Sequence, residues 1–459
     1  MALDNCTLER MKCAAEERQR PSGKPPEHRR VSLRLAEVLR GRDFRLLWGG
    51  EFVSLLGDQF FTVALPWLVL QLTGNALAIG AILAVGAAPR AVFILLGGAL
   101  IDRFSPRTVM LYSNLGRMIL VALLAALSAG GWVHLWMLYV FSLLLGLGYA
   151  FYLPAQSAMI PRLVSTDRLQ AGNALIQGTA QLSLFLGPVL AGVLIALVGR
   201  DGTGAAAVPE FTGIGIVLAL DAASFLVSAI TLTLITVPPV RRELSDAAHP
   251  PVLRSLAQGM IGVWHDKTLR YYFILIGAVN LALLGPLAVG IPVLAATRLS
   301  GGALAYGGIL SGLGAGALLG VVAGGVMRRP RGRAFAAVML GSSGLLGVGL
   351  AALGAVPSTG PAAAAAFVIG IAEGYLTIQF ITWLQLRTPP EELGRMISIL
   401  LFAAVGQAPL SNLVAGALIG LHPSLVMIGA GSFIVLVVTV AAFSPSVWRL
   451  DEAGERRPS

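Results

Sequence analysis

Residues 97–107 read GGALIDRFSPR and join two apolar segments, near 76–101 and 107–129. Each segment is long enough to cross a bilayer as a helix, because a span takes about 20 mostly apolar residues. The joining stretch carries one Asp, two Arg and a Ser-Pro pair, residue types that favour a polar turn. The sequence therefore predicts a helical hairpin that crosses a membrane, turns within a few residues and crosses back.

The whole composition agrees with a membrane protein. Of 459 residues, 56% are hydrophobic and 12% are charged, and the mean hydropathy is +0.80. An ordinary soluble domain has about twice that share of charged residues. The net charge of +10 comes from Lys and Arg in short segments between apolar runs, which indicates membrane topology and not nucleic-acid binding. The two cysteines, Cys6 and Cys13, have no metal-ligand spacing, so we expect neither a metal nor a cofactor.

Windows of about 20 residues predict twelve transmembrane helices, which makes the fold class all-α and integral to the membrane. The predicted spans are 45–72, 76–101, 107–129, 132–156, 169–198, 211–237, 269–297, 305–327, 333–354, 361–386, 395–421 and 424–446. A hydrophilic segment divides them into two six-helix bundles. The expected units are a basic tail 1–43, a first bundle 44–237, a central loop 238–268, a second bundle 269–447 and a tail 448–459.

Lys and Arg are distributed unequally between the two sides of the predicted membrane. With the N-terminus inside, 29 of the 33 fall in the tails and the expected inner loops, and 2 fall in the expected outer loops. Cytoplasmic loops carry such an excess of positive charge. We therefore expect a multi-pass protein of the cell inner (cytoplasmic) membrane with both termini in the cytoplasm.

The hairpin has a recognisable spacing. Gly98, Asp102, Arg103 and Arg107 form G-x-x-x-D-R-x-x-x-R, which resembles the signature between helices 2 and 3 of the major facilitator superfamily, without the Gly that usually follows the Asp-Arg pair. Gly98 would let another helix approach closely, and a carboxylate such as Asp102 favours a helix N-terminus. The resemblance implies a cytoplasmic gating latch; the alternative is an ordinary turn.

The fifth predicted span carries a second pattern. Gly178, Gly187, Pro188 and Gly192 resemble the antiporter signature of exporters in the same superfamily, with Ala191 in place of one Gly. A Gly-Pro pair bends a helix, and glycines permit close helix packing. The pattern implies export, although close packing alone would require the same residues.

Three further segments, 58–67, 221–225 and 385–395, resemble one branch of the superfamily. That branch contains enterobactin exporters, macrolide-efflux proteins and related multidrug exporters, and the resemblance covers residues 44–447. One departure is that 135–152 has no charged residue, whereas one group of drug–proton antiporters has an Arg in helix 4. Proton coupling therefore cannot be inferred from that pattern.

Five charged residues fall deep within predicted spans, where a charge needs a partner or a water-filled cavity. The acids are Asp58, Asp221 and Glu373, and the bases are Arg90 and Arg117. By position along their helices Asp58 and the two arginines can meet in the first bundle. We expect Asp58 to carry the coupling proton, with Glu373 and then Asp221 as alternatives. A static charge cluster is the competing interpretation, above all for the arginines.

Asp58 also shares a helix face with Glu51, Ser54 and Thr62, and polar faces of spans meet water or protein, not lipid. Other polar residues recur at helical spacing in other spans. The candidates for a cavity wall are Ser54, Thr62, Tyr152, Gln156, Gln177, Gln181, Tyr375 and Thr377, with aromatic residues Phe60, Phe61, Trp67, Phe380 and Trp383 between them. Such a wall suits a large, partly aromatic molecule, although aromatic residues in spans more often serve packing.

Together these features predict a major facilitator transporter that exports a drug-like, macrolide-like or siderophore-like molecule by alternating access, coupled to protons. Its expected partners are the lipid bilayer, a small-molecule substrate and protons, without nucleic acid, and we expect a monomer. An importer of the same fold is the first alternative. A membrane-embedded acyl- or prenyltransferase is another, but paired-His and Asp-Asp-x-x-Asp motifs are lacking, as is a phosphate-binding loop. A non-transporting sensor would look alike.

Overall fold

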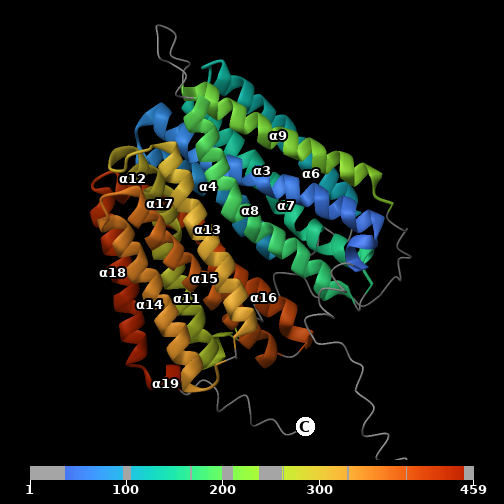
Figure 1. Ribbon diagram of the computed structural model, residues 1–459. Helices are drawn as coiled ribbons and strands as arrows, with labels where there is room; N and C mark the ends of the chain where they lie inside the picture. The colour runs from blue at the N-terminus through green and yellow to red at the C-terminus, as the bar shows by residue number, and fades with distance from the viewer. Residues whose placement is uncertain are drawn as a thin grey trace, which may run out of the picture.

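The computed structural model describes residues 37–96, 105–165, 168–198, 210–236, 261, 263–327, 330–388 and 390–448. Within these residues the regular elements are all helical (Figure 1). They are α3 (Arg42–Thr73), α4 (Ala76–Leu96), α6 (Pro106–Ala129), α7 (Leu135–Leu163), α8 (Leu169–Val198), α9 (Glu210–Leu234), α11 (Lys267–Gly285), the π-helix η2 (Pro286–Gly290), α12 (Ile291–Thr297), α13 (Ala303–Val326), α14 (Arg333–Ala355), α15 (Thr359–Arg387), α16 (Pro390–Val405), α17 (Ala408–Ile419), α18 (Pro423–Ala442) and α19 (Pro445–Trp448).

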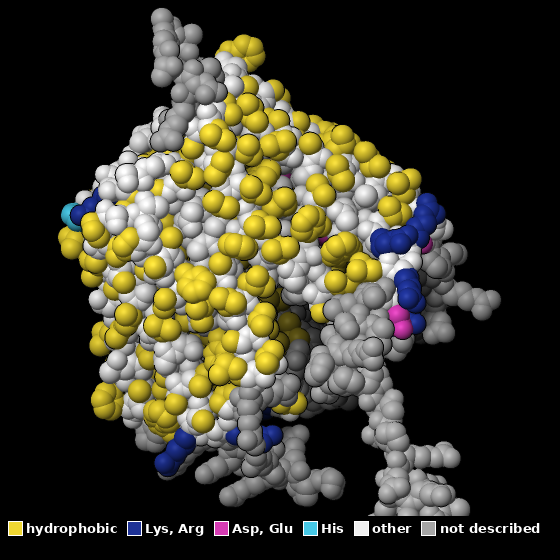
Figure 2. All heavy atoms as spheres, viewed as in Figure 1, with side chains coloured by type: hydrophobic (Ala, Val, Ile, Leu, Met, Phe, Trp, Pro, Cys, Tyr) yellow, Lys and Arg dark blue, Asp and Glu magenta, His cyan; other side chains and the backbone are white. Residues whose placement is uncertain are grey.

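The helices are long and apolar enough to cross a membrane. Eleven such segments occur among the described residues, and α4 adds a shorter apolar helix at the position of the second predicted span. Apolar side chains also spread over the face of the molecule shown in Figure 2, as expected where lipid replaces water. The predicted all-α membrane fold is confirmed, with eleven of the twelve predicted spans long and apolar enough to cross a membrane among the described residues.

Two predicted boundaries differ from the structure. The fourth span was predicted to end at residue 156, but α7 continues to Leu163. Its last turns bury Ala155, Met159 and Ile160 in a cluster with residues of α3 and α8, and this packing outweighs the helix-breaking tendency of the two prolines. The eleventh span begins near 390, and it is interrupted at residues 406–407, between α16 and α17.

The helices form two halves, which we call the N-half (α3–α9) and the C-half (α11–α19). In the N-half α3 and α6 pack on α9, α8 packs on α3, and α4 packs on α7. In the C-half α13 packs on α15, α14 on α15 and α18, and α11 on α17. The two halves meet along α8 with α13 and along α4 with α17. Figure 1 shows the halves diverging from that contact.

Successive helices run in opposite directions, so the molecule has two ends. We call the end with the α3–α4 turn (Thr73–Ala76) the closed end and the end where α3 begins (Arg42) the open end. At the closed end Gly80 of α4 lies against the main chain of Asn412 and Gly416 in α17, and Gly192 of α8 lies against Ala303 and Gly307 in α13. We call these two glycine contacts the closed-end seams. A hollow separates the halves toward the open end (Figure 2).

The seventh span is not a regular helix. It comprises α11, the π-turn η2 and α12. The Ser411 hydroxyl of α17 accepts the N–H of Gly285 at 2.7 Å and donates to the carbonyl of Leu281 at 2.6 Å. One side chain thus bridges a donor and an acceptor that would pair directly in a continuous α-helix. π-turns inside α-helices occur often at functional sites.

Candidate functional site

The site begins on α3, which carries two carboxylates two turns apart, Glu51 and Asp58. The glycines of α3 allow α9 to pack closely beside them. An added Cβ at Gly57 would lie 2.7 Å from Oδ1 of Asp221 on α9, and one at Gly50 would meet Thr231. The local sequence therefore brings polar groups of α3 and α9 together at the centre of the N-half.

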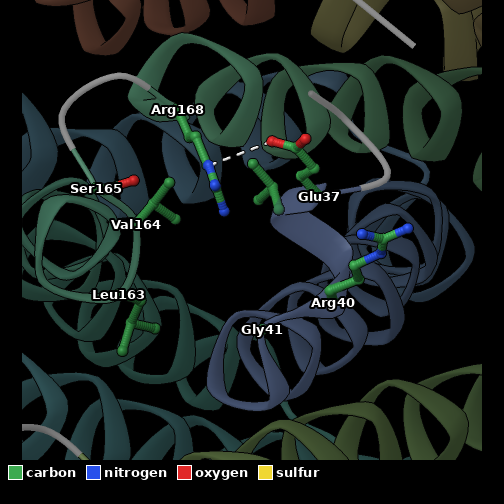
Figure 3. A pocket seen from close by; sticks show the side chains of 8 residues that line it. Glu37, Arg40, Gly41, Leu163, Val164, Ser165 and Arg168 are labelled. Atoms are coloured by element: carbon green, nitrogen blue, oxygen red, sulfur yellow. Dashed lines mark ion pairs between the residues drawn. The ribbon is translucent and has the colours of Figure 1, made fainter. Parts of the chain in front are cut away.

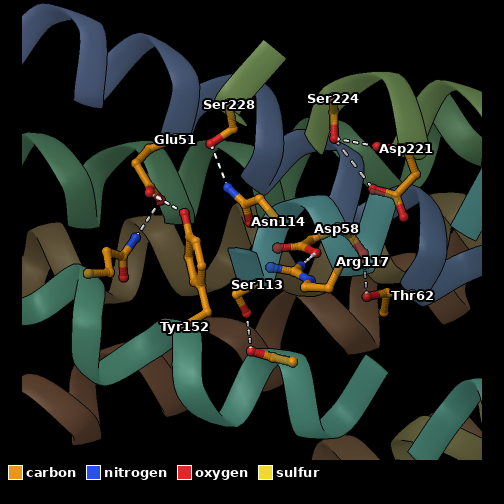
Figure 4. A network of polar contacts seen from close by, with 12 residues as sticks. Glu51, Asp58, Thr62, Ser113, Asn114, Arg117, Tyr152, Asp221, Ser224 and Ser228 are labelled. Carbon is orange, nitrogen blue, oxygen red and sulfur yellow. Dashed lines mark hydrogen bonds and ion pairs between the residues drawn. The ribbon is translucent and has the colours of Figure 1, made fainter. Parts of the chain in front are cut away.

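Asp58 forms an ion pair with Arg117 of α6 (Figure 4). The Arg117 side chain is only 4% exposed and that of Asp58 is 22% exposed, so the cation is the more deeply buried member of the pair. The guanidinium also lies over aromatic rings, with Cζ 4.0 Å from the ring centroid of Phe225 and 5.3 Å from that of Tyr152. These contacts supply the compensation that a buried cation requires.

Glu51 is the main functional candidate that sequence reasoning underrated. It is 1% exposed, and its two oxygens accept hydrogen bonds from the Tyr152 hydroxyl and from Nε2 of Gln156, both on α7. Figure 4 shows this group on the other side of Arg117 from Asp221. Its spacing of seven residues from Asp58 was visible in the sequence, but its two partners, a hundred residues away, were not.

Arg90 of α4 lies apart from the ion pair. Its side chain is exposed, and its Cζ lies 4.3 Å from the ring centroid of Tyr149 on α7. Arg117 lies 5.6 Å from the same ring, so Tyr149 is shared by the two arginines. Arg90 also interacts electrostatically with Asp58. The structure thus brings together the three charged residues that the sequence placed at similar depth, with only Arg117 in direct contact with the acid.

Asp221 of α9 is fully buried. Its Oδ1 has one long contact, 3.5 Å, from the Ser224 hydroxyl, and its Oδ2 has no hydrogen-bond partner. The next polar contact along α9 joins Ser228 to Nδ2 of Asn114 on α6 at 2.9 Å. The sequence did not single out Asn114, because one amide within an apolar helix carries no pattern.

The remaining cavity candidates do not join this cluster. Glu373 and Thr377 lie exposed on α15 of the C-half, beside half-buried Tyr375, and Glu373 has no hydrogen bond or ion pair within the described part of the chain. Ser54 is buried, and the Thr62 hydroxyl donates to the main-chain carbonyl of Asp58 at 2.8 Å. On α8, Gln177 is exposed and Gln181 is half-buried.

The aromatic wall expected from the sequence is largely packing. Trp67 is 2% exposed and stacks on Tyr306 of the C-half, with ring centroids 6.3 Å apart. Phe380 is 3% exposed, in a cluster with Tyr272 and Trp383. These rings bury apolar area in contacts between helices.

The hairpin that dominates the sequence analysis lies mostly outside the described residues, as Gly98, Asp102 and Arg103 do. Arg107 is described, at the start of α6. Its Nε donates to the carbonyl of Leu232 and its Nη2 to that of Thr233, each at 2.7 Å. A cation at the last carbonyls of a helix completes the hydrogen bonds that the helix end leaves open. Arg107 therefore caps the C-terminus of α9.

The glycine–proline pattern of α8 lies where the halves meet. Gly187 packs against Gln59 of α3, and Gly192 forms one closed-end seam with α13. Directly after Pro188, the N–H of Val189 donates to the Ser311 hydroxyl of α13 at 2.9 Å, which is a hydrogen bond between the halves. Gly178 differs, because the structure leaves open space around it.

A separate pocket lies at the open end, between the beginning of α3 and the α7–α8 turn (Figure 3). Its volume is about 430 Å³, and Glu37, Arg40, Ser165 and Arg168 contribute its polar side chains. Glu37 and Arg168 form an ion pair at 3.4 Å with both side chains 41% exposed. Exposed pairs contribute little to stability, and the pocket is distinct from the buried cluster.

Apolar spanning helices in two halves, with a buried charge cluster at the centre of one half, define a multi-pass membrane transporter. Residues 47–407 match the Major Facilitator Superfamily, and the chain belongs to this family.

Characterised relatives are efflux proteins. The chain is 27% identical over 413 residues to the multidrug efflux pump Tap of Mycolicibacterium fortuitum, covering 87% of this chain and 95% of that protein. It is 22% identical over 361 residues to macrolide efflux protein A of Streptococcus pyogenes, covering 78% and 84%. Among solved structures, the nucleoside transporter NupG (D323A mutant) shares the fold with a TM-score of 0.71 at 14% identity, covering 88% of this chain and 100% of that one.

Proposed function

We propose that this protein is a proton-coupled exporter of drug-like or macrolide-like molecules in the cytoplasmic membrane. Its N-half and C-half would move as two bodies about the closed-end seams. The observation that carries the proposal is the buried Asp58–Arg117 ion pair at the centre of the N-half. The names of the efflux relatives support the export direction.

The ion pair suits coupling because it responds to protonation. A protonated Asp58 no longer attracts Arg117 as an anion does, so the contact between α3 and α6 weakens. The side chain of Asp58 is 22% exposed whereas that of Arg117 is 4% exposed, so the acid is the more accessible member. A proton that arrives at Asp58 thus changes the charge balance at the centre of the N-half.

The charge distribution supports an inward-facing state. Lys and Arg concentrate in the segments at the open end, which the positive-inside rule assigns to the cytoplasm together with both termini. A substrate would then enter from the cytoplasm through the hollow between the halves, while the seams close the opposite side. Separation of the seams would release the substrate outside. We propose a monomer as the working unit, since each half contributes to this path.

Transport into inside-out vesicles tests the function. With a proton gradient of about one pH unit, one-for-one exchange supports about tenfold accumulation of a macrolide, because one unit corresponds to about 1.4 kcal/mol. Collapse of the gradient with a protonophore should abolish the accumulation. Vesicles with Asp58→Asn should equilibrate the compound without accumulating it.

Glu37→Gln is the matched control, since Glu37 is an acid at the open end outside the cluster; it should transport as wild type does. Accumulation by Asp58→Asn equal to wild type would remove Asp58 from coupling. Accumulation that survives the protonophore would end the proton-coupled mechanism. Gradient-driven uptake into right-side-out vesicles would instead identify an importer.

A further inference from the structure

Two charged side chains of the N-half cluster each have a buried polar atom without a partner, as the amide of Asn114 also does at its Oδ1. The atoms of the charged side chains are Nη1 of Arg117 and Oδ2 of Asp221, each without a hydrogen bond and without contact with solvent. Buried polar groups are normally paired, and those that are not need a physical explanation. The two atoms belong to residues of opposite charge that interact electrostatically, so the explanation must involve both.

Arg117 lies between two acids. On one side it contacts Asp58 of α3. On the other side its Cζ lies 4.0 Å from the ring centroid of Phe225, one turn after Asp221 on α9. The Asp221 carboxyl in turn lies close to Gly57, the residue before Asp58. Figure 4 shows the three charged side chains next to one another.

The charges of this group do not balance if both acids are ionised. The charged groups that face Asp221 are Asp58 from α3 and Arg117 from α6, and Ser224 of its own helix gives it only a 3.5 Å contact. An ionised carboxylate would be buried here without a strong donor, which is costly. Two further charged groups border these three residues: Glu51, which accepts hydrogen bonds from Tyr152 and Gln156, and Arg90, which is exposed. Within Arg117, Asp58 and Asp221, one cation and two acids are neutral when the two acids share one proton.

We propose that Arg117 exchanges partners between Asp58 and Asp221, and that in this conformation the shared proton resides on Asp221. When a cation binds Asp58, Arg117 moves to Asp221, and the Asp221 O–H bond breaks to give a carboxylate and a released proton. One positive charge arrives and one departs, so the cluster stays neutral. This deepens the proposed function, on which it depends for its role in transport, and it identifies the substrate class as organic cations that displace one proton.

A double-mutant cycle of thermal unfolding in detergent at pH 7 tests the exchange without any transport. Asp221→Asn replaces a neutral side chain by one of similar shape and should leave the melting temperature close to that of wild type. Asp58→Asn should lower it only modestly, because Arg117 then pairs with an ionised Asp221. The double variant leaves Arg117 buried without an acid, so its loss should far exceed the sum of the two single losses.

Addition of Arg117→Gln to the double variant removes the unpaired cation and should restore much of the lost stability. This rescue separates a charge effect from a packing defect. Additive losses in the cycle, or a double variant that Arg117→Gln does not rescue, would overturn the partner exchange. A large loss for Asp221→Asn alone would show that Asp221 is already ionised and paired.

Infrared difference spectra locate the proton directly, through the carbonyl stretch of a protonated carboxyl group. Wild type minus Asp221→Asn should contain this band. Asp58→Asn minus the double variant should lack it, because Asp221 is then ionised. Absence of the first band, or presence of the second, would overturn the assignment. Both measurements use purified protein without a proton gradient. The partner exchange can therefore be supported when the vesicle assay contradicts proton-coupled export, and it can be contradicted when that assay supports export.

Discussion

Asp266 fixes the beginning of α11 at the open end. Its Oδ1 accepts the N–H groups of Thr268 and Leu269, at 2.8 and 3.1 Å, and its Oδ2 accepts Nη2 of Arg387 from the end of α15 at 2.8 Å. Partial burial would raise the pKa of this carboxyl, but the hydrogen bonds from Arg387 and from the two N–H groups outweigh burial and hold the pKa below its ordinary value.

Because the pKa of Asp266 is lowered by folding, the stabilisation is present at neutral pH and is lost as the pH falls below about 4, through the folded-state pKa. Asp266→Asn keeps an acceptor at the cap but removes the negative charge, so it should cost about 0.3–1 kcal/mol at pH 7, from the ion pair with Arg387 and the charge at the helix N-terminus. The difference from wild type should shrink at pH 3. Thermal unfolding at both pH values measures this.

Lys267→Gln is the control, because this neighbour is exposed and lies outside the hydrogen-bonded group. It should change little at either pH. If Asp266→Asn lost as much stability at pH 3 as at pH 7, the negative charge of Asp266 would contribute nothing to folding stability.

The sequence singled out charged residues within the spans but not all of their partners. Asp58 and Arg117 were recognisable because charged residues in spans are rare. Glu51 was noted only as part of a polar face, and its partners Tyr152 and Gln156 lie on α7, where their contacts depend on helix packing. The unpartnered state of Asp221 also depends on which groups surround it, and no local pattern encodes that.

Among the elements, the seventh span departs most from a regular helix. The Ser411 hydroxyl accepts the N–H of Gly285 and donates to the carbonyl of Leu281. Ser411→Ala removes both hydrogen bonds, at an expected cost of about 1–3 kcal/mol. Thermal unfolding of the purified variant in detergent measures this loss.

Ser183→Ala is a matched control, because Ser183 is equally buried, at 1% exposure, and its hydroxyl has no hydrogen-bond partner. Its removal should be neutral or slightly stabilising. Equal losses of stability for the two variants would mean that the two hydrogen bonds of Ser411 contribute no stability beyond the packing of its side chain.

Element boundaries were predictable from hydropathy where the described chain leaves a helix at an apolar-to-polar transition or a Gly or Pro, as after α6 and α14. They were not predictable where packing decides. The last turns of α7 are helical because their apolar face is buried. The interruption between α16 and α17 is marked in the sequence only by Gly406 and Pro409. A hydropathy window averages over both features.

For the molecule as a whole, the orientation in the membrane remains to be measured. Residues Ser165 and Ser358 are both exposed, at the open and the closed end. In a background without Cys6 and Cys13, Ser358→Cys should react with a membrane-impermeant thiol reagent in intact cells. Ser165→Cys should react only after permeabilisation. The reverse pattern would invert the proposed topology and the direction of transport.

The overall fold was the most predictable property, because the bilayer restricts long apolar segments to spanning helices. Twelve apolar segments in the sequence, divided by a polar central segment, are enough to predict an all-α, multi-pass membrane protein of two helical bundles. How the halves meet was less accessible: Gly192 was recognised within a motif, whereas Gly80 and its contact with α17 were not.

The closed-end seams have a mechanical consequence. Main chain lies against main chain at Gly80 with Gly416 and at Gly192 with Gly307, so side chains do not interlock there as knobs in holes. Two backbone surfaces without interlocking side chains can tilt relative to each other without first separating. This lowers the free-energy barrier to the conformational change in each transport cycle. Gly80→Leu or Gly192→Leu would place a side chain between the two backbones. Such a variant should still fold but interconvert more slowly between its inward-facing and outward-facing conformations.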